Sequence, residues 1–181
     1  MFIEAAFLVI DKAEIRVLEV GFGTGLNALL ASIYARTKGV KINYTSIEKY
    51  PLDEAVWGFL NYGEIMHEND FFQCINKSEW EKEIQISEDF TLQKIKADLN
   101  SISFSTTFDC IFFDAFSPDK QPELWTNQVF EKLFACTANN GILTTYCAKG
   151  AVRRAMQLAG YQVERIPGPT GKREMLRARK M

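Results

Sequence analysis

Short apolar runs alternate with helix-like segments along most of this 181-residue chain. One such run, residues 108–113, reads Phe-Asp-Cys-Ile-Phe-Phe and stops at Asp114, which is typical of a buried central strand. Elsewhere apolar residues return at helical spacing, as at Leu26, Leu29 and Ile33. Strands that alternate with helices predict an α/β fold, with a mostly parallel sheet and helices on both faces.

The pattern predicts seven strands, at residues 16–20, 42–47, 91–97, 108–113, 141–146, 161–166 and 173–179. Helices are expected at residues 26–33, 51–60, 66–83, 124–136 and 148–159. The last two strands are joined by Pro-Gly-Pro-Thr-Gly at 167–171, which is too short for a parallel crossover. We therefore expect an antiparallel last strand, and we interpret residues 1–181 as a single domain of ordinary size.

The composition narrows the class of protein. Hydrophobic residues make up 47% and charged residues 24% of the chain, as in folded globular proteins. No stretch approaches the ~18 apolar residues of a membrane helix, and the first ten residues lack the basic start of a signal peptide. The cysteines form no C-x-x-C pair and there is one histidine, so we expect no metal site. Unpaired thiols suit a reducing compartment, and we expect a cytoplasmic protein.

Charge is distributed unevenly. Residues 149–181 contain nine basic and two acidic side chains, a net charge of +7, while the other 148 residues sum to −9. Clustered basic charge is typical of a phosphate-binding face. A solvated basic surface is the alternative on charge alone.

A glycine-rich loop follows the first expected strand. Gly21, Gly23 and Gly25 form G-x-G-x-G, but Leu26 stands where the dinucleotide-binding fingerprint requires a glycine. Such a loop lies at the carboxyl ends of the strands, where open α/β sheets bind ligands. With Glu19 two residues ahead, it resembles the first motif of class I S-adenosylmethionine (SAM) methyltransferases. The sulfonium and ammonium groups of SAM suit a nearby carboxylate.

Two further acids end strands. Glu48 closes the second strand, 27 residues after Gly21, where an acid can accept hydrogen bonds from both ribose hydroxyls. Asp98 follows the third strand, where SAM enzymes commonly place an acid against the adenine amino group. The alternative for each is a solvated acid at the end of a strand.

The central strand delivers Asp114 to the same crevice. Methylation of a primary amine requires a free lone pair, and such an amine is mostly protonated at neutral pH, so a proton acceptor is needed. Asp114 is the candidate, as a base or as an electrostatic stabiliser. Phe116 and Trp125 are candidates to stack on a nucleobase, with a lid or core contact as the alternative.

Four separated stretches, residues 20–27, 114–125, 150–161 and 171–176, resemble the methyltransferase domain of the MnmC family. The resemblance spans about residues 2–178. It implies a Rossmann-like class I fold and a SAM-dependent enzyme that acts on the wobble uridine of tRNA. The implied reaction converts 5-aminomethyl-2-thiouridine to 5-methylaminomethyl-2-thiouridine.

The resemblance also implies roles for individual residues. The methionine end of SAM would lie against Glu19, Gly21, Gly23 and Gly25, the ribose against Glu48 and the adenine against Asp98. Asp114 would face the substrate amine, with Lys172 and Arg173 near the substrate mouth. Family members usually have a segment upstream of Phe2, and many carry a C-terminal FAD-dependent oxidase domain. This sequence begins almost at the first expected strand and ends at Met181, so we expect the methyltransferase domain alone, without the upstream segment and without oxidase activity. Methylation of another amine, or SAM or RNA binding without catalysis, are the alternatives.

Overall fold

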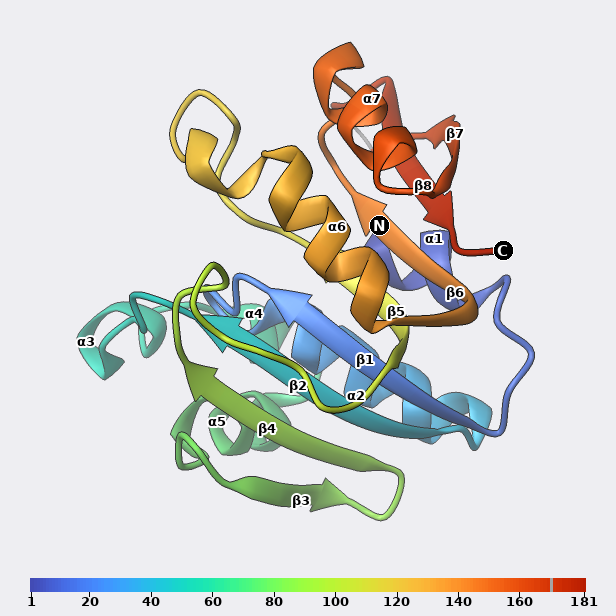
Figure 1. Ribbon diagram of the computed structural model, residues 1–181. Coiled ribbons are helices and arrows are strands. Elements are labelled where there is room, and N and C mark those ends of the chain that lie inside the picture. The colour runs from blue at the N-terminus through green and yellow to red at the C-terminus, as the bar shows by residue number, and fades with distance from the viewer. Residues whose placement is uncertain (170) are drawn as a thin grey trace.

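The computed structural model describes residues 1–169 and 171–181; Thr170, in the loop between the last two expected strands, lies outside the described residues. The described strands form one eight-stranded sheet in the order β3-β4-β2-β1-β5-β6-β8-β7 (Figure 1). Their bounds are β1 Glu14–Val20, β2 Lys41–Glu48, β3 Glu83–Ser87, β4 Phe90–Lys96, β5 Phe108–Phe113, β6 Thr137–Thr145, β7 Gln162–Pro167 and β8 Glu174–Arg179.

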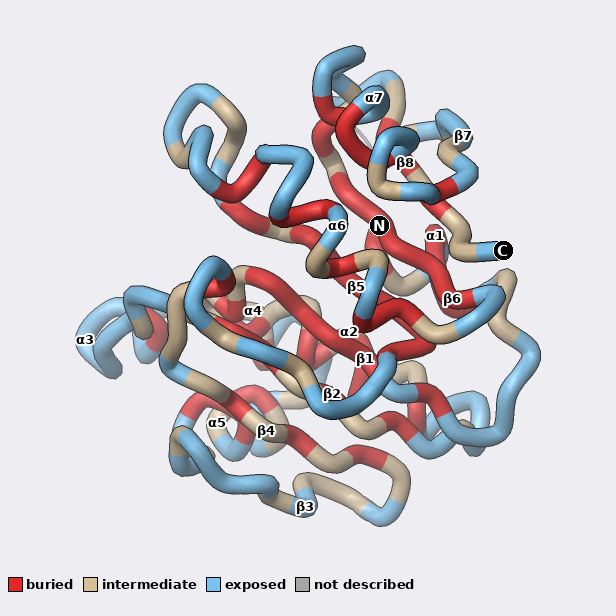
Figure 2. The backbone as a smooth tube through the Cα atoms, in the orientation of Figure 1, coloured by how far each residue is buried: buried red, intermediate tan, exposed pale blue. Residues whose placement is uncertain are grey.

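Helices cover both faces of the sheet (Figure 1). Helices α1 (Phe2–Phe7), α2 (Leu26–Lys38) and α5 (Asn69–Lys77) pack on one face, and α6 (Asn127–Cys136) and α7 (Gly150–Leu158) pack on the other. Strand β5 shows the division, because Cys110 and Phe112 face α1 and α2 while Ile111 and Phe113 face α6. All six residues of β5 are buried (Figure 2), as its apolar run predicts.

The sheet is mostly parallel, as predicted. Strands β4, β2, β1, β5 and β6 pair in parallel, so their carboxyl ends meet at one edge of the sheet. Strand β8 runs antiparallel to both β6 and β7. The predicted antiparallel last strand is therefore confirmed.

The prediction of seven strands is wrong by one, because the strand β3 begins at Glu83, the last residue of the helix predicted at 66–83. Within that segment only α5 is helical, preceded by the short helix α4 (Tyr62–Ile65), and the chain then turns into β3, which pairs antiparallel with β4 at the sheet edge. Ile84 and Ile86 alternate with polar residues, which is strand spacing. Trp80 falls five residues after Ile75, out of phase with the helix, and marks the change.

Two other segments differ from expectation. The helix predicted at 51–60 is limited to α3 (Glu54–Trp57), and a short 3-10 turn (Pro122–Leu124) precedes α6. The first residues form α1, whose Phe2 and Phe7 rings each lie 5.5 Å from the ring of Phe112. These aromatic contacts explain why an apolar N-terminal stretch packs under the sheet.

Of the helices in the described ranges, none is long and apolar enough to cross a membrane. Three of the cysteines are buried and Cys74 is exposed.

Candidate functional site

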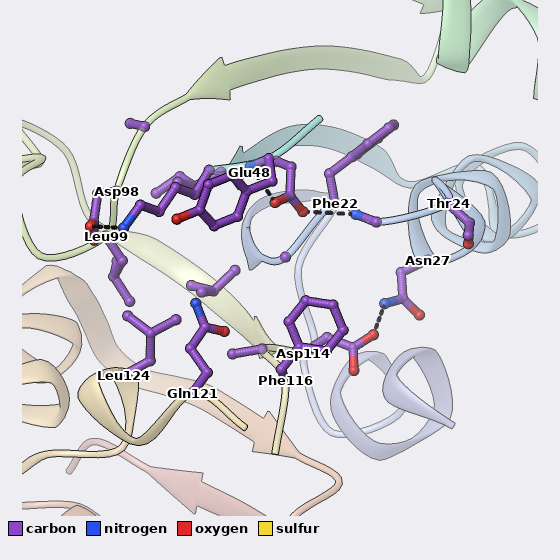
Figure 3. Close-up of a pocket in the computed structure, with 18 of the residues that line it drawn as sticks. Phe22, Thr24, Asn27, Glu48, Asp98, Leu99, Asp114, Phe116, Gln121 and Leu124 are labelled. Atoms are coloured by element: carbon purple, nitrogen blue, oxygen red, sulfur yellow. Dashed lines mark hydrogen bonds and ion pairs between the residues drawn. The ribbon is translucent and has the colours of Figure 1, made fainter. Parts of the chain in front are cut away.

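A cavity of about 350 Å³ lies at the carboxyl ends of β1, β2, β4 and β5 (Figure 3). Each strand contributes the residues that follow it: Gly21 and Gly23 after β1, Glu48 at the end of β2, Asp98 after β4 and Asp114 after β5. These five sequence-predicted residues therefore meet at one place. They meet because parallel strands end at the same edge of the sheet.

The glycine loop lies close to the end of β5. Gly21 has φ +94°, and a Cβ added there would lie 2.8 Å from the carbonyl oxygen of Asp114. Gly23, at φ +51°, points its backbone N–H at the carboxylate of Glu48, with a distance of 3.1 Å to Oε2. Only glycine satisfies the first position, which requires both a left-handed backbone and a close approach.

Glu48 and Asp98 lie on the side of the cavity away from α2. The other oxygen of Glu48, Oε1, accepts a hydrogen bond of 2.8 Å from the backbone N–H of Tyr50. Asp98 forms a 2.8 Å ion pair with Lys49, and the Lys49 ammonium holds the pKa of Asp98 below its usual value. Both carboxylates are thus fixed in orientation at the cavity wall.

Asp114 is the acid at the centre of the site. The side-chain amide of Asn27, in the first turn of α2, donates a 3.0 Å hydrogen bond from Nδ2 to Oδ2 of Asp114 (Figure 3). Burial raises the pKa of Asp114 to about 6, against the opposing effects of the Asn27 hydrogen bond and the Lys172 charge. At neutral pH this group is therefore mainly a carboxylate, and a stronger base than an exposed aspartate.

Glu19 and Gly25 do not line the cavity. Glu19 is fully buried beneath the loop, where its carboxyl accepts hydrogen bonds from Ser46 Oγ at 2.7 Å and from Asn27 Nδ2 at 2.9 Å. Burial raises the pKa of Glu19 to about 8. Gly25 is buried at the start of α2 with φ +77°. The structure thus places both residues beneath the cavity, and their contact with a ligand stays a prediction.

The two aromatic residues predicted at the site, Phe116 and Trp125, differ in exposure. Phe116 is 72% exposed and lines the cavity mouth, where it is free to stack. Trp125 is buried against Phe113 and Phe130, and its indole N–H donates a 2.8 Å hydrogen bond to the carbonyl of Phe116. Trp125 therefore lies in the core and holds the Phe116 backbone, which is the core contact named above as the alternative to stacking on a base.

The basic pair lies beside the cavity without lining it. Lys172 places its ammonium 3.8 Å from the ring centroid of Tyr146, whose hydroxyl donates a 2.8 Å hydrogen bond to the carbonyl of Ala115. Lys172 is thereby held close to Asp114, whose pKa it lowers. Arg173 is exposed next to it.

Asn27 is the functional residue that sequence reasoning missed. The alternation of side chains along β1 and β5 could have indicated it. This alternation places Glu19 and Asp114 on the face of the sheet that α2 covers. The buried carboxyl group of Glu19 requires a donor, and Asn27 in the first turn of α2 supplies it and also donates to the half-buried Asp114. In the described ranges, no group of three or more His, Cys, Asp or Glu side chains is placed to hold a metal ion.

Comparison with known proteins gives a family match. A family model described as S-adenosyl-L-methionine-dependent methyltransferase matches residues 64–181. The chain is 29% identical over 172 residues to the tRNA 5-methylaminomethyl-2-thiouridine biosynthesis bifunctional protein MnmC of Methylobacillus flagellatus, covering 88% of this chain and 26% of that protein. It is 30% identical over 175 residues to MnmC of Nitrosospira multiformis, with coverage of 87% and 27%. The chain thus spans about a quarter of the length of these curated relatives.

Solved structures give the same fold. A crystal structure of MNMC2 from Aquifex aeolicus superposes with a TM-score of 0.69 at 23% identity, covering 98% of this chain and 58% of that one. SAM-bound CalS10, an amino pentose methyltransferase from Micromonospora echinaspora, superposes with a TM-score of 0.54 at 11% identity, covering 92% and 84%. At these identities the superpositions establish shared architecture.

Proposed function

The chain belongs to a family of S-adenosyl-L-methionine-dependent methyltransferases, and we propose that it methylates the primary amine of a 5-aminomethyl-2-thiouridine at the wobble position of tRNA. The observation that carries the proposal is the basic carboxylate of Asp114 at the wall of the cavity. The MnmC relatives are named for the biosynthesis of 5-methylaminomethyl-2-thiouridine in tRNA, the product of this reaction, and they supply the substrate class.

The cavity fits SAM. Its volume of about 350 Å³ is in the range of small-molecule sites, and Ile47, Ala97 and Leu99 give it apolar walls suited to a purine ring. In this proposal Glu48 holds the ribose hydroxyls and Asp98 the adenine amino group. The backbone at Gly21 and Gly23 is left for the methionine end. When bound, SAM supplies an electrophilic methyl group.

Asp114 has the properties that N-methylation of an amine requires. An alkylammonium ion has no free lone pair, so a proton must leave the nitrogen before or during attack on the methyl group. A carboxylate with its pKa raised to about 6 attracts the ammonium ion and accepts its proton more readily than an exposed aspartate does. Lys172, close to Asp114, disfavours a second positive charge there and thus favours the neutral amine.

The basic segment supports tRNA as the source of that amine. Within the described ranges, Lys149, Arg165 and Arg177 are engaged in ion pairs with acids. By contrast, four exposed basic side chains of α7 and of the loop before β8 form no salt bridge within the described ranges: Arg153, Arg154, Lys172 and Arg173. These side chains are available to bind phosphates. Phe116 at the mouth adds an exposed ring for stacking on a base. A tRNA substrate also implies action in the cytoplasm.

The test is single-turnover methyl transfer from labelled SAM to tRNA that carries the aminomethyl uridine, followed by digestion to nucleosides. The label should appear in 5-methylaminomethyl-2-thiouridine. Asp114→Asn should lower the rate by about 10²–10⁴, the usual span for loss of a general base, with partial rescue at higher pH. Asp11→Asn, which removes an exposed acid three residues before β1, is the matched control.

Two results would count against the proposal. If the protein transferred label to a small primary amine but never to tRNA, the substrate would be a small molecule and not a tRNA. A wild-type rate for Asp114→Asn at pH 7 would remove Asp114 from the proton transfer and leave it as a cap on the end of β5.

A further inference from the structure

Two carboxyl groups and one amide form a continuous hydrogen-bonded chain from the cavity wall to the buried residue beneath it. A single nitrogen, Nδ2 of Asn27, donates to Oε1 of Glu19 at 2.9 Å and to Oδ2 of Asp114 at 3.0 Å. An amide nitrogen carries two hydrogens, so both bonds form at once and exhaust its donors. The hydrogen bond to Glu19 therefore fixes the orientation of the Asn27 amide, and this orientation directs the second N–H at Asp114.

The surroundings of Glu19 determine its charge. The side chain is fully buried, and it accepts hydrogen bonds from the Ser46 hydroxyl and from the amide of Asn27. The buried Tyr44 hydroxyl also faces it and has no other hydrogen-bond partner in the described structure, so it is available to the proton of an uncharged Glu19. The titratable groups that face it are Tyr44 on β2 and Asp114 after β5, and neither carries a positive charge. An ionised carboxylate buried without a cation is costly, so such a group remains protonated.

We propose that Asn27 is a positioning residue whose amide holds the Asp114 carboxylate against the cavity, and that Glu19 anchors this amide as an uncharged carboxylic acid. In this arrangement the linked group of Glu19, Asn27 and Asp114 holds one negative charge, located on Asp114 where the substrate amine arrives. Burial raises the pKa of Glu19 to about 8, in agreement with the uncharged form at neutral pH. The consequence for rate rests on the proposed function, whereas the consequence for Asp114 itself does not.

The first test measures the titration of Asp114 directly, by ¹³C-carboxyl NMR of protein without SAM or tRNA, with the signal assigned by its loss in Asp114→Asn. Asn27→Leu removes the hydrogen bond to the carboxylate, so the pKa of Asp114 should rise by about one unit or more. Asn43→Leu is the matched control, because Asn43 donates a comparable 2.7 Å bond to Glu14 at the far edge of the sheet. Should Asn27→Leu fail to fold, Asn27→Ala takes its place.

The second test concerns Glu19. Glu19→Leu removes the acceptor that fixes Asn27 and should raise the pKa of Asp114 as Asn27→Leu does. Glu19→Gln keeps an oxygen acceptor and should restore the titration of Asp114 to within a few tenths of a unit of wild type. If Glu19 were ionised instead, Glu19→Gln would remove a neighbouring negative charge and lower the pKa of Asp114 clearly, which overturns the uncharged anchor.

Kinetics separate this inference from the proposed function. The acid limb of the single-turnover rate in Asn27→Leu should move to higher pH by the same amount as the NMR titration. An unchanged pKa of Asp114 in folded Asn27→Leu overturns the positioning role, whatever the substrate is. A shifted pKa without a shifted pH–rate profile sustains the positioning role and contradicts proton acceptance by Asp114.

Discussion

Replacing Gly21 with alanine would place a methyl group 2.8 Å from the carbonyl oxygen of Asp114 and 3.2 Å from its carbonyl carbon. The φ of +94° at this position adds backbone strain of about 1–3 kcal/mol for a residue with a Cβ. Overpacking against the end of β5 costs about 1–3 kcal/mol more. Gly21→Ala should therefore lower the free energy of unfolding by at least about 2 kcal/mol and displace the backbone that carries Asp114.

Gly23→Ala in the same loop is the matched comparison. Its φ is +51°, and a Cβ built there meets no atom within 4 Å in the described structure, so strain of about 1–2 kcal/mol is the only cost. Urea unfolding of both variants at pH 7, followed by circular dichroism, should show Gly21→Ala to be the less stable by at least about 1 kcal/mol. Equal losses, or a larger loss at Gly23, would refute the claim that close approach to β5 requires Gly21.

Three further predictions concern ligands and pH. Glu48→Ala should weaken SAM binding by about 1.5–3 kcal/mol through loss of charge-assisted hydrogen bonds, and calorimetry showing wild-type affinity would reject the ribose assignment. Alanine at both Lys172 and Arg173 should make the salt dependence of tRNA binding shallower, by about 0.7–0.9 per lost phosphate contact, without weakening SAM binding; an unchanged slope would make this a solvated surface. The free energy of unfolding of the wild type should fall relative to that of Glu19→Gln as the pH rises from about 4.5 to 8, because folded Glu19 keeps a proton that the unfolded chain releases. Chemical denaturation at several pH values measures this difference, and a difference that does not change with pH would contradict the prediction.

The main architecture could be predicted because the buried strands have an unambiguous pattern. Residues 108–113 are apolar on both faces except at Asp109, so helices had to cover the sheet on both sides. A parallel sheet then brings the ends of its strands to one edge, which is why Gly21, Glu48, Asp98 and Asp114 meet at one cavity. This part of the site follows from topology, and topology is encoded in hydrophobic periodicity.

The remainder depends on packing that periodicity does not encode. Strand β3 is a short edge strand with two isoleucines, and its weak alternation is easily joined to the end of the preceding helix. Trp125 has the same composition signal whether it stacks on a ligand or fills the core, and its contact with Phe113 decides the matter. The hydrogen bonds of Asn27 join residues 8 and 87 positions away, and the second partner becomes visible only when β5 is placed beside β1.

The reversal of β8 has a consequence for how specificity can change. Because β8 runs against β6, its first residues lie opposite the carboxyl end of β6, with Leu176 beside Thr145. The basic residues just before β8 are thereby delivered to the ligand edge by a hairpin, independently of the crossover connections that carry the glycine loop and Asp114. Under the proposed function, exchange of residues 162–179 between relatives is expected to change the substrate that is bound, while the residues proposed to hold SAM stay unchanged.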